Sequence, residues 1–367
     1  MPSGILAFVV FVLALGGMIF VHEFGHFLAA RLFKIEVEEF GFGLPSYRLA
    51  RLFRWRGTDF TIHALPLGGF VRPKGENDPN VVGGLAAAHP WKRLVVLFAG
   101  PCMNLLTAVA VFSMLIGMHG VPMAGPIRIE EILPNSPAEA AGLMVGDLVS
   151  SIDGEAVDDV TQAIAIIRAS LDQPVQLEVQ RGAETLQLEA TPLSSRSEQE
   201  GALGVSLVPP SRPATALEML SGGALITGLQ AATILYLPVA LIQGAVAPDE
   251  ARVIGFKGIF DMFNMALRED VQTRQPAAGG TASPRPTNWT LNLIGLLSVS
   301  LGVMNLLPIP ALDGGRILFT LPEIVLRRRI PPRLENVING IAMMVLIVLL
   351  LFVNLMDFIN PAEVPIP

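Results

Sequence analysis

Residues 5–30 read ILAFVVFVLALGGMIFVHEFGHFLAA, and this stretch decides the fold. It is long and apolar enough to cross a lipid bilayer as one helix. Three polar side chains interrupt it: His22, Glu23 and His26. Residues four apart share a helix face, so both imidazoles point the same way. With the glutamate they form the HExxH pattern, which predicts two zinc ligands and a general base.

The position of this pattern strengthens the prediction. Polar groups inside a lipid-spanning helix are costly and are functional by default. The alternative is a pair of structural histidines that form hydrogen bonds inside a helical bundle. That alternative does not require Glu23, so a metal centre is favoured.

Composition limits the class of protein. The chain has 367 residues, of which 51% are hydrophobic and 16% charged, whereas soluble proteins carry about 25% charged residues. Mean hydropathy is +0.55. These values predict a polytopic α-helical membrane protein. The net charge of −7 argues against nucleic acid as a partner, and the single Cys102 excludes an internal disulfide.

Four segments are predicted to span the membrane, at about 4–32, 94–118, 291–313 and 337–357. We expect the first to be a retained transmembrane helix and not a cleaved signal peptide. Ten of the 25 Lys and Arg residues lie between Arg31 and Arg93, and five crowd residues 316–333. The positive-inside rule therefore places the first and third loops in the cytoplasm.

A further apolar stretch, 217–246, contains Glu218, Gln230, Gln243 and Pro238. If it crossed the membrane, the Arg-rich third loop would lie outside. We therefore expect it to lie against the membrane surface or the other spans.

Residues 35–75 predict a small β-element. Residues 47–55 and 60–65 have the character of strands joined around Arg56-Gly57. Such a sheet offers an edge to an extended peptide. A hairpin that merely orients the helices remains the alternative.

Residues 122–195 predict a soluble α+β domain outside the membrane. Ser136-Pro137-Ala138-Glu139 is a capping box, and Asp153-Gly154 a hairpin turn. The pattern from Ser136 to Asp147, followed by Ile152-Asp153-Gly154, resembles a bacterial-type PDZ domain. PDZ domains bind extended C-terminal peptides by strand addition.

A catalytic zinc usually has three protein ligands and a water, so one ligand is missing. The best candidate is Asp313, which lies at the cytoplasmic end of the third span, in the run Asn305 to Gly315. The two prolines there free backbone carbonyls, which lipid does not tolerate unless they line a cavity or pack on protein. The topology places Asp313, His22 and His26 towards the cytoplasmic side.

Together, His22-Glu23-Phe24-Gly25-His26, the Asn305–Gly314 segment and the interposed PDZ-like domain resemble the site-2 proteases of the bacterial RseP-like type, across nearly the whole chain. The resemblance implies a multi-pass protein of the bacterial cytoplasmic membrane that cleaves peptide bonds in or near transmembrane segments. It implies Zn²⁺ bound by His22, His26 and Asp313, and Glu23 as catalytic base. Residues 58–69 also resemble the membrane-associated β-loop of that family, so the resemblance implies a membrane-associated β-hairpin or sheet. The substrate-binding residues it suggests are Asn305, Asn104, Gly68 and Gly69.

The implied partners are single-span, pre-cleaved membrane proteins, such as anti-sigma factors or remnant signal peptides, in the lipid bilayer. The PDZ-like domain would bind peptide C-termini or filter substrate ectodomains, and the sequence does not choose between these. An inactive membrane scaffold that presents the PDZ domain is the main alternative. A metal transporter is disfavoured because spans two and four are nearly devoid of polar residues.

The predicted division of the chain is as follows: first transmembrane helix with HExxH (1–34), membrane-associated β-element (35–75), cytoplasmic segment and second transmembrane helix (76–120), PDZ domain (122–195), post-PDZ region with an apolar or amphipathic helix (196–271), flexible linker (272–288), and third and fourth transmembrane helices with Leu312-Asp313-Gly314 (289–367).

Overall fold

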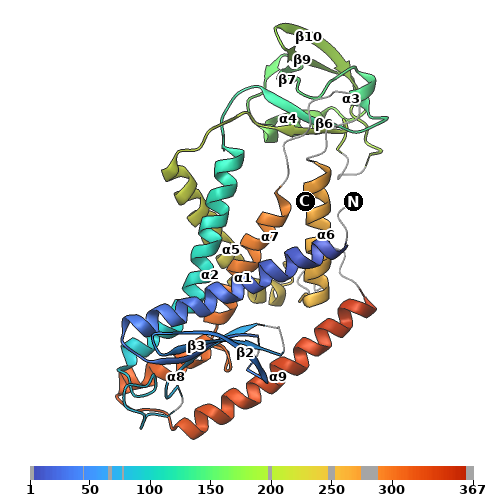
Figure 1. Ribbon diagram of the computed structural model, residues 1–367. Helices are drawn as coiled ribbons and strands as arrows, with labels where there is room; N and C mark the ends of the chain where they lie inside the picture. The colour runs from blue at the N-terminus through green and yellow to red at the C-terminus, as the bar shows by residue number, and fades with distance from the viewer. Residues whose placement is uncertain are drawn as a thin grey trace. The chain divides into compact units, whose positions relative to one another are not determined.

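The structure, a computed structural model, describes residues 4–43, 45–64, 68–76, 78–196, 201–246, 253–273 and 288–360. They fall into two compact units (Figure 1). The first comprises 1–114, 220–268 and 289–367, and the second 115–219 and 269–288. Most of the predicted linker, 274–287, lies outside the described residues.

Five described helices are long and apolar enough to cross a membrane. They are α1 (Gly4–Leu32), α2 (Pro90–His119), α5 (Ala216–Ile242), α7 (Trp289–Leu306) and α9 (Pro332–Ile359). This confirms a polytopic membrane protein but not the predicted number of about four spans. The additional helix is α5, which we expected to lie against the membrane. A further helix, α6 (Phe256–Gln272), has one apolar and one polar face.

The third predicted span is shorter than expected. Helix α7 ends at Leu306, and residues 307–312 leave the helix around Pro308 and Pro310, which cannot continue its hydrogen bonds. A new helix, α8 (Asp313–Leu326), then begins. Asp313 is therefore the first residue of α8 and not the last of the span, which corrects the predicted boundary at 313.

The β-element is a four-stranded sheet with the order β2-β3-β1-β4. Its strands are β1 (Val37–Phe42), β2 (Arg48–Trp55), β3 (Thr58–His63) and β4 (Gly69–Pro73). The sequence predicted β2 and most of β3, and Leu65 of that prediction lies outside the described residues. It missed β1 and β4. The former carries two glutamates and a glycine, and the latter lies between glycines and a proline.

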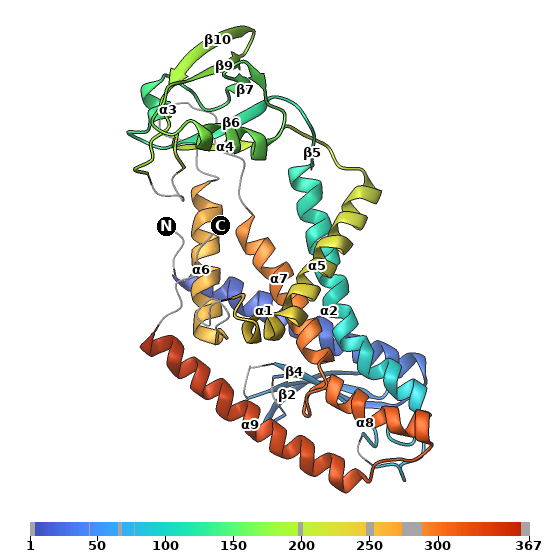
Figure 2. The same ribbon diagram turned by 180° about the vertical axis from the view of Figure 1, so that it is seen from behind.

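The apolar face of this sheet packs on the last turns of α1 (Figure 2). Phe40 and Val37 of β1 join Phe27, Ala29 and Ala30 in one buried cluster. Aromatic rings take part in this contact, and the rings of Phe27 and Phe60 meet edge to face at 6.0 Å. The sheet is thereby fixed against the helix that carries the histidines.

The opposite face of the sheet is polar. Glu39 accepts hydrogen bonds from Thr61 (2.8 Å) and His63 (3.1 Å) and pairs with Arg72 at 2.9 Å. Burial opposes ionisation of Glu39, but these partners outweigh it and hold its pKa below the ordinary value.

The second unit contains a sheet with the order β10-β9-β7-β6-β11, with β8 (Glu155–Ala156) paired to β7. The path strands are β6 (Ile127–Ile132), β7 (Leu148–Ile152), β9 (Val175–Arg181), β10 (Glu184–Ala190) and β11 (Val205–Val208). Helices α3 (Pro137–Ala140) and α4 (Val160–Ala169) belong to the same unit, and a short pair joins β5 (Val121–Pro122) to β12 (Ser211–Arg212).

The predicted local signals in this unit are present. Ser136 caps α3 by accepting a hydrogen bond from the Glu139 N–H at 3.2 Å. Asp153 and Gly154 both have positive φ, as a tight hairpin turn requires. The sheet extends beyond the predicted boundary at 195, because β11 pairs with β6.

Candidate metal centre

Three metal-ligating atoms converge where α1 meets the start of α8. The Nε2 atom of His22 lies 3.1 Å from Oδ2 of Asp313 and 3.2 Å from Nε2 of His26. His26 Nε2 lies 3.3 Å from the same carboxylate oxygen. These are the three residues that the sequence predicted as ligands, and two elements distant in the sequence supply them.

Neighbouring groups fix which nitrogens are free. Nδ1 of His26 lies 2.7 Å from the Val96 carbonyl oxygen of α2, an acceptor, so Nδ1 carries the proton and Nε2 a lone pair. Nδ1 of His22 lies 3.3 Å from the amide nitrogen of Asn104, whose own oxygen is buried without a partner. Rotating that amide by half a turn places its oxygen against a His22 Nδ1–H and frees the His22 Nε2 lone pair.

This donor set fits a zinc ion. Two imidazole lone pairs and a carboxylate at these separations repel one another unless a cation lies between them. A triangle with such sides holds an ion at about 2.0 Å from each corner, within the range of Zn–N and Zn–O bonds. Two nitrogens and one oxygen are also ligands that zinc accepts in catalytic sites.

Gly100 leaves room for the ion. A Cβ atom at this position of α2 would lie 2.9 Å from His22 Nε2 and closer still to His26 Nε2. Any side chain there would occupy the space between the ligands. Gly25 on α1 faces Ala99 and Met103 of α2 so closely that it also excludes a side chain. The two glycines allow α1 and α2 to approach at the metal centre.

The 307–312 segment positions Asp313. Gly314 and Gly315 pack against the backbone of residues 306–310, where a Cβ would clash. The Ala311 N–H donates to Asn339 of α9 at 3.0 Å. This ties the turn before Asp313 to a second helix and orients its carboxylate towards α1.

Glu23 faces the free edge of β4. The Gly68 carbonyl and the Lys74 N–H form hydrogen bonds towards β1, with Gly43 and Glu36. Backbone groups alternate in direction along a strand, so the N–H groups of residues 69 and 71 point to the opposite, free edge. The Val71 N–H donates to the Glu23 carboxylate. Gly69 lies beside it, since a Cβ there would be 3.5 Å from Glu23 Cγ.

A cavity of about 490 Å³ opens onto this centre. The predicted metal ligands and Glu23 line it together with β4, Asn305 and the start of α8. Asn305 is half-buried and donates to the Leu301 carbonyl at 3.0 Å. Its amide oxygen is a candidate acceptor for a bound backbone.

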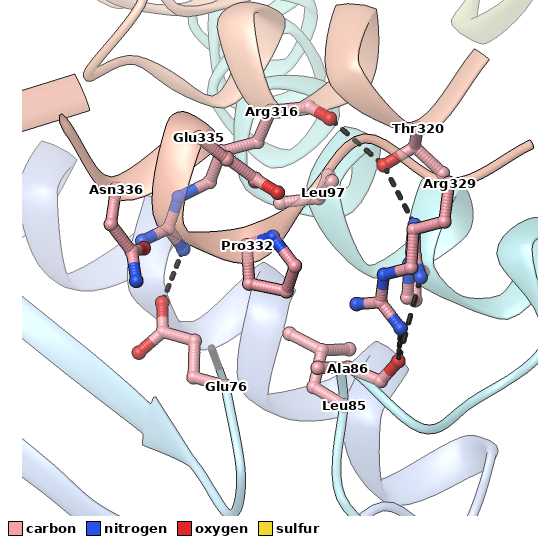
Figure 3. Close-up of a pocket in the computed structure, with 11 residues that line it drawn as sticks. Glu76, Leu85, Ala86, Leu97, Arg316, Thr320, Arg329, Pro332, Glu335 and Asn336 are labelled. Carbon is pink, nitrogen blue, oxygen red and sulfur yellow. Dashed lines mark hydrogen bonds and ion pairs between the residues drawn. The ribbon is translucent and has the colours of Figure 1, made fainter. Parts of the chain in front are cut away.

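A second, smaller cavity of about 40 Å³ lies next to it and is shown in Figure 3. Arg316, three residues after Asp313, lines both cavities and pairs with Glu76, which follows β4. Arg93 pairs with Glu323 at 2.9 Å, and Arg329 donates to the Ala86 carbonyl at 2.8 Å. These bonds tie α8 to α2 and to the segment after β4, so we assign this cavity a supporting role.

The structure brings most of the predicted site residues together. His22, Glu23, His26, Asp313 and Asn305 line one cavity, with Gly69 close to Glu23. Gly68 is not among the lining residues, and its carbonyl is bonded to Gly43. Asn104 is fully buried behind His22, which favours an orienting contact over substrate contact.

Other residues of this centre were not predicted as site residues. Gly100 and Arg316 belong to it, as do the backbone groups of Val71 and Val96. A glycine beside Pro101 in an apolar helix was a usable signal for Gly100. Backbone groups leave no such signal in a sequence.

Comparison with known proteins identifies one family and several relatives that match most of the chain. The model of peptidase family M50 matches residues 10–349. A Campylobacter jejuni protein named "putative zinc metalloprotease" is 32% identical, covering 96% of this chain and 93% of that protein. A Clostridium perfringens protein with the same description is 31% identical, covering 95% and 97%.

A solved structure also matches part of the chain. The PDZ domain of a Listeria monocytogenes SdrC-like protein covers 23% of this chain and 90% of its own, with 21% identity and a TM-score of 0.22. At that score the likeness supports no further step, and the PDZ assignment rests on the sequence pattern.

Proposed function

The chain belongs to peptidase family M50, the site-2 protease family, and we propose that His22, His26 and Asp313 hold its zinc while Glu23 is the catalytic base. The protein is an intramembrane zinc metalloprotease. The convergence of Nε2 of His22, Nε2 of His26 and Oδ2 of Asp313 carries the assignment of the ligands.

When bound, zinc lowers the pKa of a coordinated water and polarises the scissile carbonyl. The Glu23 carboxylate accepts the proton of the attacking water and delivers it to the leaving amine. The Val71 N–H holds that carboxylate in place. His26 is oriented by Val96 and His22 by Asn104, so each keeps Nε2 directed at the position that a zinc ion would occupy.

The substrate is a membrane protein whose cleaved segment is extended or locally unwound, since a helix engages its carbonyls in its own hydrogen bonds. The free edge of β4 supports this proposal, because residues 69 and 71 present backbone groups beside Glu23. Asn305 is a second contact for the released backbone.

We place the protein in a bacterial cytoplasmic membrane, with loops one and three inside and the PDZ-like unit outside. This orientation requires that α5 lies against the membrane surface or the other spans and does not cross, although it is long and apolar enough to do so. The distribution of arginine and lysine supports this orientation. The PDZ-like unit recruits a trimmed C-terminus or filters by ectodomain size. Deleting 122–208 separates these roles, since a filter predicts gained cleavage of an untrimmed substrate and a recruiter predicts lost cleavage.

The decisive experiment compares Glu23→Gln with the matched control Glu38→Gln, an exposed glutamate on β1. The first should keep about one zinc per chain and lose cleavage of a single-span substrate by about 100-fold or more. The control should keep both. Wild-type cleavage by Glu23→Gln would disprove its role, and absence of zinc from the wild type would favour the scaffold alternative.

A further inference from the structure

Strand β2 is unusual in being exposed at every residue. It is the outer strand of its sheet, and residues 47–56 read YRLARLFRWR. Arginines therefore alternate with large apolar side chains on a surface that the described residues leave uncovered. A strand that faces only water would have few large apolar residues, and a strand that faces only lipid would have few arginines. This composition is therefore typical of neither surface alone.

Two β-bulges in β2 place the three arginines on one face of the sheet. Arg48, Arg51 and Arg54 are spaced by three, which in a regular strand would put them on alternating faces. The pairing with β3 has irregularities between 48 and 50 and between 51 and 53, so Leu49 and Leu52 are extra residues. Consequently the three arginines lie opposite His63, Thr61 and Asp59, which share one face.

The resulting arginine face carries excess positive charge. The three guanidinium groups surround one carboxylate, Asp59, at 4.0, 3.6 and 3.6 Å. Each of the three side chains remains more than half exposed. The nearby Glu39 is already neutralised by Arg72 and bonded by Thr61. The arginine face is therefore short of anions.

The opposite face of the same hairpin is aromatic. Phe53 and Trp55 are about half exposed, on the side where the sheet packs against α1. The guanidinium groups of Arg31 and Arg56 lie 5.9 and 5.1 Å from the Trp55 ring centre. Aromatic rings flanked by arginine are typical of the membrane–water interface.

The sequence already predicts that this element is membrane-associated, and we propose that its β2–β3 hairpin selects anionic phospholipids of the bilayer, with the arginine face on their phosphates and Phe53 and Trp55 in the acyl region. Charge complementarity selects this partner. Location agrees, because the sheet packs on the last turns of the membrane helix α1. The hairpin then anchors the sheet that borders the metal centre to the plane of the membrane.

Trp55 provides the measurement. In a Trp91→Phe, Trp289→Phe background it is the remaining tryptophan of the chain. The full-length protein is reconstituted in phosphatidylcholine nanodiscs with brominated phosphatidylglycerol or brominated phosphatidylcholine. Half-maximal quenching of Trp55 fluorescence should need about fivefold less brominated phosphatidylglycerol than brominated phosphatidylcholine, because one net basic contact with an anionic lipid contributes about 1 kcal/mol. High salt should reduce this difference by screening the charges.

Variants test the arginine face. Arg48→Gln, Arg51→Gln and Arg54→Gln together should abolish the preference, whereas the three Lys substitutions should keep it. The matched control replaces the exposed Arg327, Arg328 and Arg333 by Gln and should also keep it. If the Gln variant fails to fold, the wild-type comparison of the two lipids still decides.

Equal quenching by the two lipids would overturn the proposal and favour an acidic protein segment as the occupant. A preference that survives the Gln substitutions would also overturn it, as would loss of the preference on adding millimolar inorganic phosphate. Fluorescence does not depend on proteolysis, so failure of the proposed enzymatic roles leaves this test intact.

Discussion

Gly100 illustrates how a single missing side chain creates a metal centre. It contributes no ligand and no hydrogen bond from a side chain. Its effect is that the ligand atoms of His22 and His26 can face an open volume at the surface of α2. At this scale the centre depends as much on what is absent at position 100 as on the three ligands.

Gly100→Ala should abolish zinc binding, because the new methyl group would occupy the position between the imidazoles. Zinc per purified chain, measured by elemental analysis, should fall from about one to near zero. Gly16→Ala on α1 is the matched control, since a Cβ there meets nothing within 4 Å. Retention of zinc by Gly100→Ala would contradict the assigned geometry.

Asn104→Ala should weaken zinc binding about 10- to 100-fold, because His22 loses the group that orients its ring. Titration against a competing chelator measures this change. Asn305→Ala should leave zinc affinity unchanged, since its amide bonds to Leu301 and not to a ligand. Equal affinities for wild type and Asn104→Ala would remove Asn104 from the centre.

At the scale of elements, β4 connects the sheet to the chemistry. One edge of the strand completes the ladder with β1, and the other edge faces Glu23. The strand therefore has two roles, one in pairing with β1 and one in positioning Glu23. The backbone groups of Phe70 and Arg72 pair with β1, and those of Gly69 and Val71 point to the edge beside Glu23.

Val71→Pro tests this division. Proline removes the N–H that reaches Glu23, while Phe70 and Arg72 can still pair with β1 at an edge strand. Cleavage should fall about 10- to 100-fold, the value of a hydrogen bond to a charged group. Zinc content should stay unchanged. Val71→Ala keeps the N–H and should retain activity, and a matching loss there would show that the side chain matters instead.

At the scale of the whole molecule, the proposed metal centre brings together distant parts of the chain. His22 and Asp313 are 291 positions apart. An ion bound by both closes a very long loop within the first unit. The second unit, with its separate sheet and core, contributes no ligand.

Removing the metal should therefore loosen one unit selectively. After treatment with a chelator, hydrogen exchange should accelerate in peptides from α1 and α8 and stay unchanged in β6–β10. The stabilisation lost is about 4 kcal/mol if free zinc exceeds its Kd a thousandfold. Added zinc should restore protection. Uniform acceleration in both units would show that the metal stabilises more than its own unit.

The sequence predicted the parts of this molecule that depend on local pattern. The HExxH helix, the proposed third ligand Asp313 and the hairpin β2–β3 follow from periodicity and residue type. Strand β1 could not be predicted from Val37–Phe42, whose acidic residues and glycine have low β-propensity. Its place in the sheet is determined by packing of Phe40 on α1, which is a tertiary effect.

The boundary between α7 and α8 also depends on tertiary packing. The prolines at 308 and 310 indicated a break, but the start of α8 at Asp313 depends on glycines that fit against residues 306–310. The orienting contacts of Val96 and Val71 involve backbone groups, which every sequence possesses. For that reason residue type predicted the proposed ligands but not the backbone contacts that orient them.

The wide separation of His22 and Asp313 in the chain has a consequence for biosynthesis. During translation the HExxH helix enters the membrane long before α8 has left the ribosome. A nascent chain at that stage offers two of the three ligands and lacks the segment that closes the cavity. The enzyme consequently acquires its hydrolytic capacity late in synthesis, and neighbouring proteins that are still being inserted are spared until then.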